Sequence, residues 1–298
     1  MRADTLFVRQ SAFIRRMRHV PVLPYLSLLP VIGHAAILRL SGRHEDVRTY
    51  FGAQIHCDPA DMIQLYLQLF GVWEPDVSLA IEGILSPGDV FVDVGANIGY
   101  DTLLGAQKVG AAGRVVAIEA SPSTFALINA NVARNPHLTN VRVANVAASR
   151  VEGTLELYEG EAGNIGAATT VAARGGQHLF TVPALPLTRI LTADEAKAAR
   201  LMKIDVEGAE APILHDILDH LAAFSPDLEI IVEMAPSTDD GAVVFQRMAE
   251  SGFRAYGIAN RYDLFWYIAW RERSPYTLLT AFPKEQTDIL FSRRAYPT

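Results

Sequence analysis

The chain has 298 residues, half of them hydrophobic, which is enough for one large domain with an appendage. Its formal net charge of −7 argues against a general nucleic-acid-binding protein, which needs a basic face. The single cysteine, Cys57, cannot form an internal disulfide or a thiolate zinc site, so a disulfide-stapled secreted domain is excluded and a cytoplasmic protein is expected.

The first 50 residues differ in charge from the rest of the chain. They contain eight arginines against Asp4, Glu45 and Asp46, which is a balance of +5 and leaves −12 for the remainder. An asymmetry of this kind occurs in solvated arms and in arms that contact an anionic surface. We therefore keep two hypotheses for residues 1–45, a solvated helical arm and a peripheral contact with a membrane.

An apolar segment over residues 20–40 follows this basic start. It contains three prolines, which fit poorly in a helix that must span a bilayer with its backbone hydrogen bonds made. The segment predicts a helix that packs on the main domain or lies on a membrane surface. Residues 1–60 are accordingly predicted to form an accessory, partly helical extension, with a short hairpin over 47–57 that turns at Gly52.

Residues 61–298 are predicted to form one α/β domain. A helix capped by Asp58 or Asp61 opens it, a second helix covers 77–85, and strands then alternate with helices. Such alternation is typical of a mostly parallel sheet with helices on both faces, and the last strand is expected to lie antiparallel at the edge. The expected strands are 90–94, 114–119, 141–147, 154–158, 201–206, 228–234, 253–258 and 288–292, and the expected helices are 99–108, 122–135, 209–221 and 243–251.

A glycine-containing turn follows the first of these strands. Gly95 and Gly99 let the backbone turn tightly and approach a ligand, and Asp93 lies at the tip of the strand. Glu119 ends the next strand, where an acidic side chain can accept hydrogen bonds from two ribose hydroxyls. The two features together predict a nucleoside-binding site.

A nicotinamide dinucleotide is the alternative ligand for such a turn. Its G-x-G-x-x-G fingerprint fails here, because Asn97 and Tyr100 stand where the second and third glycines belong. S-adenosylmethionine (SAM) carries a cationic amino-acid part and no phosphate, so carboxylates suit it better. An NAD-dependent oxidoreductase nevertheless stays open as an alternative.

Two motifs resemble the FkbM family of SAM-dependent methyltransferases. Residues 88–99, GDVFVDVGANIG, are similar to motif I of that family, and residues 203–210, KIDVEGAE, are similar to its K-x-D-x-E-G-x-E signature. Weaker matches are 71–74, 131–135 and 232–233, and the resemblance covers about residues 55–292. It implies a class I, Rossmann-like methyltransferase with a mostly parallel seven-stranded sheet, helices on both faces, an antiparallel edge strand and an N-terminal helical extension.

The resemblance also implies a set of cofactor-binding residues. Asp93, Gly95 and Asn97 would surround the methionine part of SAM, and Glu119 would hold the ribose. Gly99 and Asp205 are further expected cofactor-binding residues. The adenine would lie near Asn145, Val146 and Ala147. One departure is Ala120, which stands where the family often has the first proline of an E-P-x-P segment. The residues that would line the adenine are therefore left undecided on this side.

The end of the strand over 201–206 is the predicted position for the chemistry. Asp205 ends the strand and is the first candidate for a base or an acceptor-orienting group, with Glu207 in the following turn and Glu233 at the tip of the next strand as further candidates. Glu210 is a candidate substrate ligand, although a carboxylate in the first turn of a helix also stabilises the helix dipole. Lys203 can neutralise these carboxylates.

The remaining candidates are weaker. Asn164 lies in a glycine-rich loop that resembles the family's acceptor-side loop, and His178 and His215 are alternative bases. No His/Asp spacing supports a metal, so none is expected. The sequence thus predicts O-methylation of a small-molecule or glycan hydroxyl; a non-catalytic SAM-binding protein at a membrane surface is a further alternative, and the oligomeric state stays open.

Overall fold

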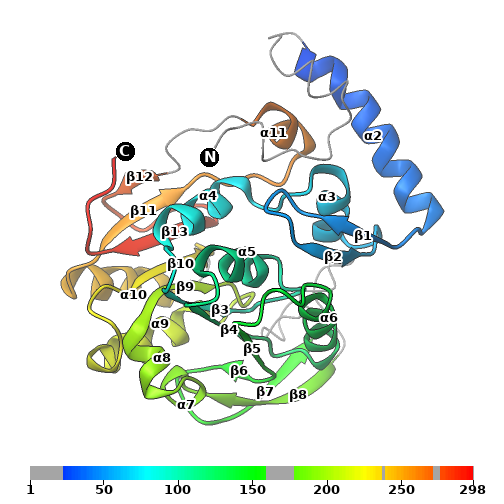
Figure 1. The fold of residues 1–298 in the computed structure, drawn as a ribbon. Helices are drawn as coiled ribbons and strands as arrows, with labels where there is room; N and C mark the ends of the chain where they lie inside the picture. Colours follow the sequence, from blue (N-terminus) through cyan, green and yellow to red (C-terminus); the bar gives the residue numbers. More distant parts are fainter. Residues whose placement is uncertain (1–22, 159–177, 237–238, 271–275, 298) are drawn as a thin grey trace.

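A mixed sheet of eight strands runs through the centre of the structure, with helices on both faces (Figure 1). The structure is a computed structural model that describes residues 23–158, 178–236, 239–270 and 276–297. From one edge to the other the strands are β12 (Tyr276–Leu279), β11 (Arg254–Ile258), β13 (Thr287–Ser292), β10 (Glu229–Met234), β9 (Ala199–Ile204), β3 (Val90–Val94), β4 (Arg114–Ile118) and β5 (Val141–Ala144).

The five strands from β10 to β5 are parallel to one another, whereas β13 is antiparallel to β10 and β11. This confirms the predicted α/β class. The sheet has one strand more than the seven expected, because the short strand β12 adds antiparallel at the edge. The strand predicted near 288–292 lies inside the sheet and not at its edge, which agrees with the burial of five of the six residues of β13.

Each face of the sheet has its own hydrophobic core. Phe91, Leu201 and Ile231 face one core, whereas their neighbours Val92 and Met202 face the other, as the period-two alternation of strands requires. The first core is covered by α4 (Pro75–Ile84), α5 (Tyr100–Val109) and, beside β4 and β5, α6 (Pro122–Ala133). The second is covered by α8 (Ala193–Ala198), α9 (Glu210–Asp219) and α10 (Asp239–Glu250).

The N-terminal part contains a long helix, α2 (Leu23–Ser41), then the hairpin β1 (Glu45–Arg48) and β2 (Gln54–Cys57), and α3 (Met62–Phe70). The hairpin turns at Gly52 as predicted, and Asp61 caps α3 by accepting a hydrogen bond from the Gln64 amide. None of the helices in the described ranges is long and apolar enough to span a bilayer.

The hairpin packs on the main body of the structure. Asn135 exchanges two hydrogen bonds with the backbone of Gln54, and Asn131 accepts one from the amide of His56. Val47, at 0% exposure, belongs to the same core as Phe91. The boundary between an extension over 1–60 and a domain over 61–298 stays a prediction.

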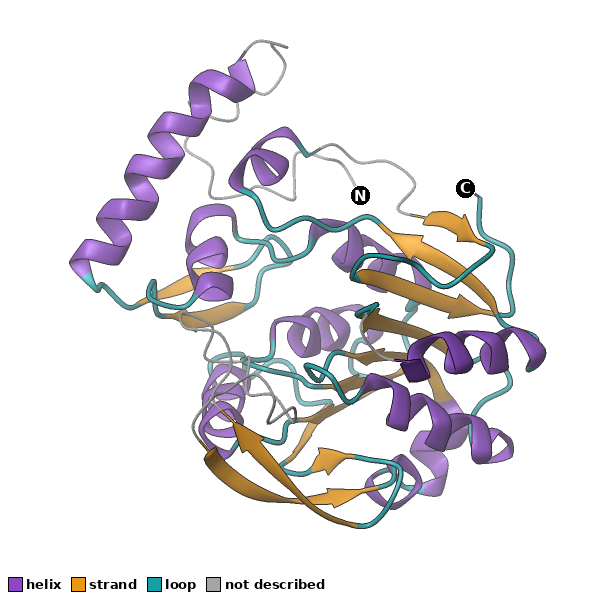
Figure 2. Ribbon diagram, turned by 180° about the vertical axis from the view of Figure 1, so that it is seen from behind, coloured by secondary structure: helices purple, strands orange, loops and turns teal. Residues whose placement is uncertain are grey.

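A small second sheet lies at the bottom of the view in Figure 1, next to β5, and is also seen at the bottom of Figure 2. It contains β6 (Ala147–Ala148), β8 (His178–Leu185) and β7 (Gly153–Tyr158), and α7 (Leu187–Ile190) leads from it to α8. The sequence pattern predicts no helix or strand between 158 and 201, so β8, α7 and α8 were not expected. The same holds for η2 (Leu221–Ala223) and α11 (Leu264–Ala269). The predicted acceptor-side residue Asn164 lies outside the described residues.

Candidate active site

The turn after β3 fits closely against the end of β9. The parallel register pairs Val94 with Ile204, which brings Gly95 next to Asp205. A Cβ atom on Gly95 would lie 1.8 Å from the backbone oxygen of Asp205, and Gly95 itself has a φ of +82°. Glycine is therefore required here by space and by conformation.

Glu119 fixes the other side of this turn. Its carboxylate accepts hydrogen bonds from the amides of Asn97 (2.9 Å) and Ser121 (2.8 Å), while Asn97 adopts a left-handed φ of +49°. Each carboxylate oxygen has a second lone pair, so two ligand hydroxyls can still be accepted. Burial raises the pKa of Glu119 to about 7 against the opposing effect of these amide donors.

Asp93 lies at the base of the turn and is almost fully buried, with 1% exposure. The hydroxyl of Thr102 in α5 donates to its carboxylate at 2.5 Å. Burial raises the pKa of Asp93, and the nearby Lys203 opposes this shift. The site therefore holds a buried carboxyl group directly beneath the glycine turn.

Lys203 contacts one carboxyl group of α5 and one that directly follows β9. Its ammonium group lies 2.9 Å from Asp205 Oδ2 and 3.4 Å from Asp101 Oδ2, as expected for a cation that neutralises the acidic residues. Burial alone lowers the pKa of a lysine, but the surrounding carboxylates of Asp205, Asp101, Glu74 and Asp93 raise that of Lys203 well above its usual value. The lysine is therefore a fixed positive charge.

A second carboxyl cluster, the acceptor-side cluster, lies beyond Asp205 along the same edge of the sheet. It consists of Glu74, Glu233, Asp288, Asn260 and Tyr262. Glu233 in β10 lies opposite Asp288 in the antiparallel neighbour β13. The side-chain amide of Asn260 donates hydrogen bonds to Glu74 (2.9 Å) and to Asp288 (2.9 Å). Glu74 is 4% exposed and has a left-handed φ of +42°, a strained backbone of the kind found at functional sites.

Tyr262 bridges two carboxyl groups of this cluster. Its oxygen lies 2.8 Å from Glu74 Oε1 and 3.0 Å from Glu233 Oε1. A phenol has one proton and can donate it to only one of these two carboxyl groups at a time. Burial raises the pKa of both Glu74 and Glu233 to about 7.

Several residues of the two clusters were not singled out as site residues from the sequence. These are Asp101, Asn260, Tyr262 and Asp288; Glu74 was noted only as part of a weak family match. Asp288 begins a strand that the pattern analysis found, so the rule that ligands bind at strand ends would have found it once β13 had been placed inside the sheet. Tyr262 and Asn260 follow β11 in a loop, and no sequence signal marks them.

The other predicted residues lie around these clusters. Glu210 uses its carboxylate within its own loop, where Oε1 accepts hydrogen bonds from the amides of Gly208 and Val206. Glu207 lies in that loop with a φ of +56°. The side-chain amide of Asn145 donates to the carbonyls of Glu119 and Ala120, beside the buried Val146. Their roles toward SAM and substrate stay predictions.

The two histidines have other contacts. His215 lies 3.1 Å from Asp240 and also contacts Arg247, so its ring joins α9 to α10. His178 is in the small sheet and contacts Thr181 at 3.2 Å. Within the described ranges, no group of three His, Cys, Asp or Glu side chains could hold a metal ion.

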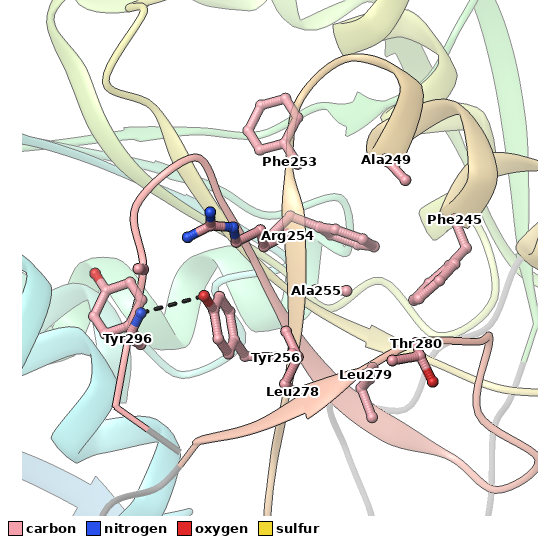
Figure 3. Close-up of a pocket in the computed structure, with 12 residues that line it drawn as sticks. Phe245, Ala249, Phe253, Arg254, Ala255, Tyr256, Leu278, Leu279, Thr280 and Tyr296 are labelled. Carbon is pink, nitrogen blue, oxygen red and sulfur yellow. Dashed lines mark hydrogen bonds between the residues drawn. The ribbon is translucent and has the colours of Figure 1, made fainter.

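A separate cavity of about 580 Å³ lies at the opposite ends of β11 and β13 (Figure 3). Side chains of α10, β11 and β12 line it, and on its wall the Tyr296 amide donates to the Tyr256 hydroxyl at 3.2 Å. Its lining residues include no carboxyl group and none of the predicted site residues. The cavity is therefore not part of the candidate active site.

The sheet has the α/β architecture expected of a Rossmann-like methyltransferase, with parallel central strands and helices on both faces. The family model described as "Methyltransferase FkbM domain" matches residues 93–255, more than half of the chain, and the chain belongs to that family. It is a SAM-dependent methyltransferase. Among functionally curated proteins, no sequence matches this chain.

Comparison with solved structures finds distant likenesses. One is a SAM-dependent O-methyltransferase from Thermotoga maritima, with 13% identity, coverage of 85% of this chain and 79% of that one, and a TM-score of 0.42. Another is a fibrillarin from Aeropyrum pernix with bound SAM, with 10% identity, coverage of 72% and 73%, and a TM-score of 0.41. A third is a putative rRNA methylase from Clostridium thermocellum, with 11% identity, coverage of 72% and 92%, and a TM-score of 0.41. These likenesses are too distant to add to the argument.

The groups around the glycine turn fit SAM. Asp93, Asp101 and Glu119 put three buried carboxyl groups around the turn, which suits a ligand of net positive charge and opposes the pyrophosphate of a dinucleotide. Glu119 would hold the ribose hydroxyls and Asp93 the amino-acid part. The dehydrogenase alternative therefore has no support in the site.

We expect the affinity for SAM to fall below pH 7. Glu119 has a pKa of about 7 in the free protein, and a cationic ligand favours its ionised form, so protons must leave as SAM binds near and below that pH. Calorimetry should show a dissociation constant that rises about tenfold from pH 8 to pH 6. Glu119→Gln should bind more weakly at pH 8 and show a smaller pH dependence; an equal pH dependence in both proteins would reject this role for Glu119.

Proposed function

We propose that the protein transfers the methyl group of SAM to a hydroxyl group of a small molecule or glycan, with Glu233 as the general base. The observation that carries this proposal is the contact of the Tyr262 hydroxyl with the carboxyl groups of both Glu74 and Glu233. A hydroxyl acceptor must lose a proton as its oxygen is methylated, and a base with a pKa near the working pH is best suited to accept that proton. Glu233, with a pKa of about 7, has this property.

Bound SAM supplies an activated methyl group, so the protein has to align the acceptor and remove its proton. Glu233 is half-buried at the tip of β10, while Glu74 lies deeper and contacts Tyr262 from the other side. In this proposal the carboxylate of Glu233 would accept the hydroxyl proton as the acceptor oxygen takes the methyl group, whose bond to the sulfur of SAM would break. Tyr262 then holds the protonated Glu233 in place by hydrogen bonding.

Asp205 has a different role in this account. The sequence favours it as the base, but its carboxylate is engaged by the ammonium group of Lys203 at 2.9 Å. We assign Asp205 to the alignment of SAM and the acceptor, next to Gly95, and leave proton removal to Glu233.

The shape of the acceptor side favours a polyhydroxylated molecule. Tyr262 stacks on Trp73 with ring centres 5.3 Å apart and an interplanar angle of 10°, and the tyrosine remains 38% exposed whereas the tryptophan is buried. One aromatic face is thus held rigidly beside carboxyl groups. Carbohydrates are bound by this combination, because carboxylates accept hydrogen bonds from hydroxyls and aromatic rings pack on C–H faces.

The test is a transfer assay with methyl-labelled SAM and a panel of sugars, glycosides, phenols, carboxylic acids and amines. We expect labelled methyl ethers from sugar or other alcohol acceptors, identified by NMR of the product. Products in which the methyl group is attached only to nitrogen would reject the hydroxyl proposal. Binding of SAM without turnover of any acceptor would favour the non-catalytic alternative.

A further inference from the structure

The helix α2 is attached to the body of the protein along one side only (Figure 1, Figure 2). Its closest helical neighbours are α11 and α3. Val31 is 3% exposed, and Leu28 packs against the core that this side of the protein shares. This contact places α2 firmly and leaves the opposite side of the helix to solvent.

The outward side of α2 is apolar. Leu29, Ile32, Ile37 and Leu40 are 74%, 45%, 67% and 89% exposed. At 100° per residue these four side chains fall within an arc of about 140°, opposite Val31. Four large exposed aliphatic side chains on one helix face are costly in water, and such a face marks a contact with a partner or a membrane.

The charges around this face select the partner. Arg39 and Arg43 are exposed at the C-terminal end of α2, and of the two acidic residues that begin the hairpin, Glu45 and Asp46, the second is paired with His56 and Arg134. The first 50 residues carry +5, whereas the rest of the chain carries −12. A second copy placed on this face would add arginines of the same charge as Arg39 and Arg43, whereas an anionic lipid surface is complementary to them.

We propose that α2 lies flat on an anionic lipid surface, with Leu29, Ile32, Ile37 and Leu40 in the boundary between headgroups and acyl chains. The arginines at the end of the helix then face the lipid headgroups. The acidic remainder of the protein is repelled by the same surface, so the charge asymmetry fixes which side faces the membrane. The proposal is independent of the identity of the methyl acceptor.

Co-sedimentation of the full-length protein with lipid vesicles tests the proposal. Binding is expected to vesicles of phosphatidylcholine with phosphatidylserine, to be weak with phosphatidylcholine alone, and to decrease with salt. Leu29→Asp with Ile37→Asp should lower binding at least about tenfold. The matched control is Val151→Asp with Leu278→Asp, which changes two residues that are 68% and 50% exposed elsewhere and should bind as the unchanged protein does.

Three results would overturn the proposal. The first is equal vesicle binding by the α2 variant and the control variant, with both shown to be folded by their melting temperatures. The second is a dimer in solution that Leu29→Asp with Ile37→Asp dissociates while no vesicle binding occurs, since this would make a second copy the occupant. The third is binding that resists extraction with alkaline carbonate, which indicates a spanning segment and not a surface contact.

Discussion

Replacing Glu233 by Gln should lower kcat for a hydroxyl acceptor by about 10²–10⁴-fold, the usual contribution of a general base. The amide keeps the size of the side chain and can still hydrogen-bond to Tyr262, but it cannot accept the proton of the acceptor. Affinity for SAM should change little, because the groups assigned to the cofactor lie on β3, β4 and β9. Steady-state kinetics with parallel calorimetry measures both quantities.

The pH profile provides the sharper test of this role. In the unchanged protein kcat should rise with pH through about 7, since Glu233 must be deprotonated to act. Tyr262→Phe removes a hydrogen bond that lowers the pKa of Glu233, so the rising limb should move to higher pH. The control is Glu250→Gln, on the exposed last turn of α10, which should leave the profile unchanged. An unchanged profile in Tyr262→Phe, or full activity in Glu233→Gln, contradicts the assignment.

Replacing Gly95 by Ala should destabilise the protein by more than about 4 kcal/mol or prevent folding. The added methyl group would lie 1.8 Å from the backbone oxygen of Asp205, and backbone atoms at the end of a buried strand cannot move away without breaking the sheet. The positive φ of +82° adds strain. Any folded fraction should fail to bind SAM, because the turn and Asp205 would no longer fit together.

Gly88→Ala is the matched control for this substitution. Gly88 also has a positive φ, of +95°, but no atom lies within 4 Å of the position of an added Cβ. It should therefore show only the conformational cost, about 1–2 kcal/mol, and retain SAM binding. Chemical denaturation of both variants separates the two effects, and similar losses of stability would refute the steric argument.

Much of this fold could be predicted from hydrophobic patterns. The central parallel strands β3 and β10 are runs of mostly apolar, buried residues, and β3 was predicted with its observed bounds, 90–94. The hairpin at Gly52 and a helix cap at Asp58 or Asp61 were predicted from local turn and capping chemistry, which does not depend on the rest of the chain, and Asp61 is the cap. The elements between 178 and 198 were missed because they are short or have no clear period.

The candidate site was predictable only where it follows the strands. Asp93, Glu119, Asp205 and Glu233 all stand at or next to the carboxyl ends of parallel strands, so the sheet brings them to one edge. The partners of Glu233 were not predictable in this way. Tyr262 and Glu74 are 188 positions apart in the chain, and only the packing of the loop after β11 against the start of α4 brings them together.

The proposed roles rest on the direction in which the methyl group faces. A crystal structure with S-adenosylhomocysteine is the most direct measurement, because the sulfur atom marks the origin of the methyl group. The account predicts ribose hydroxyls on Glu119 and a sulfur atom that faces the acceptor-side cluster, between Asp205 and Glu233. A sulfur atom that points away from Glu233, or a ribose without contact to Glu119, would contradict it.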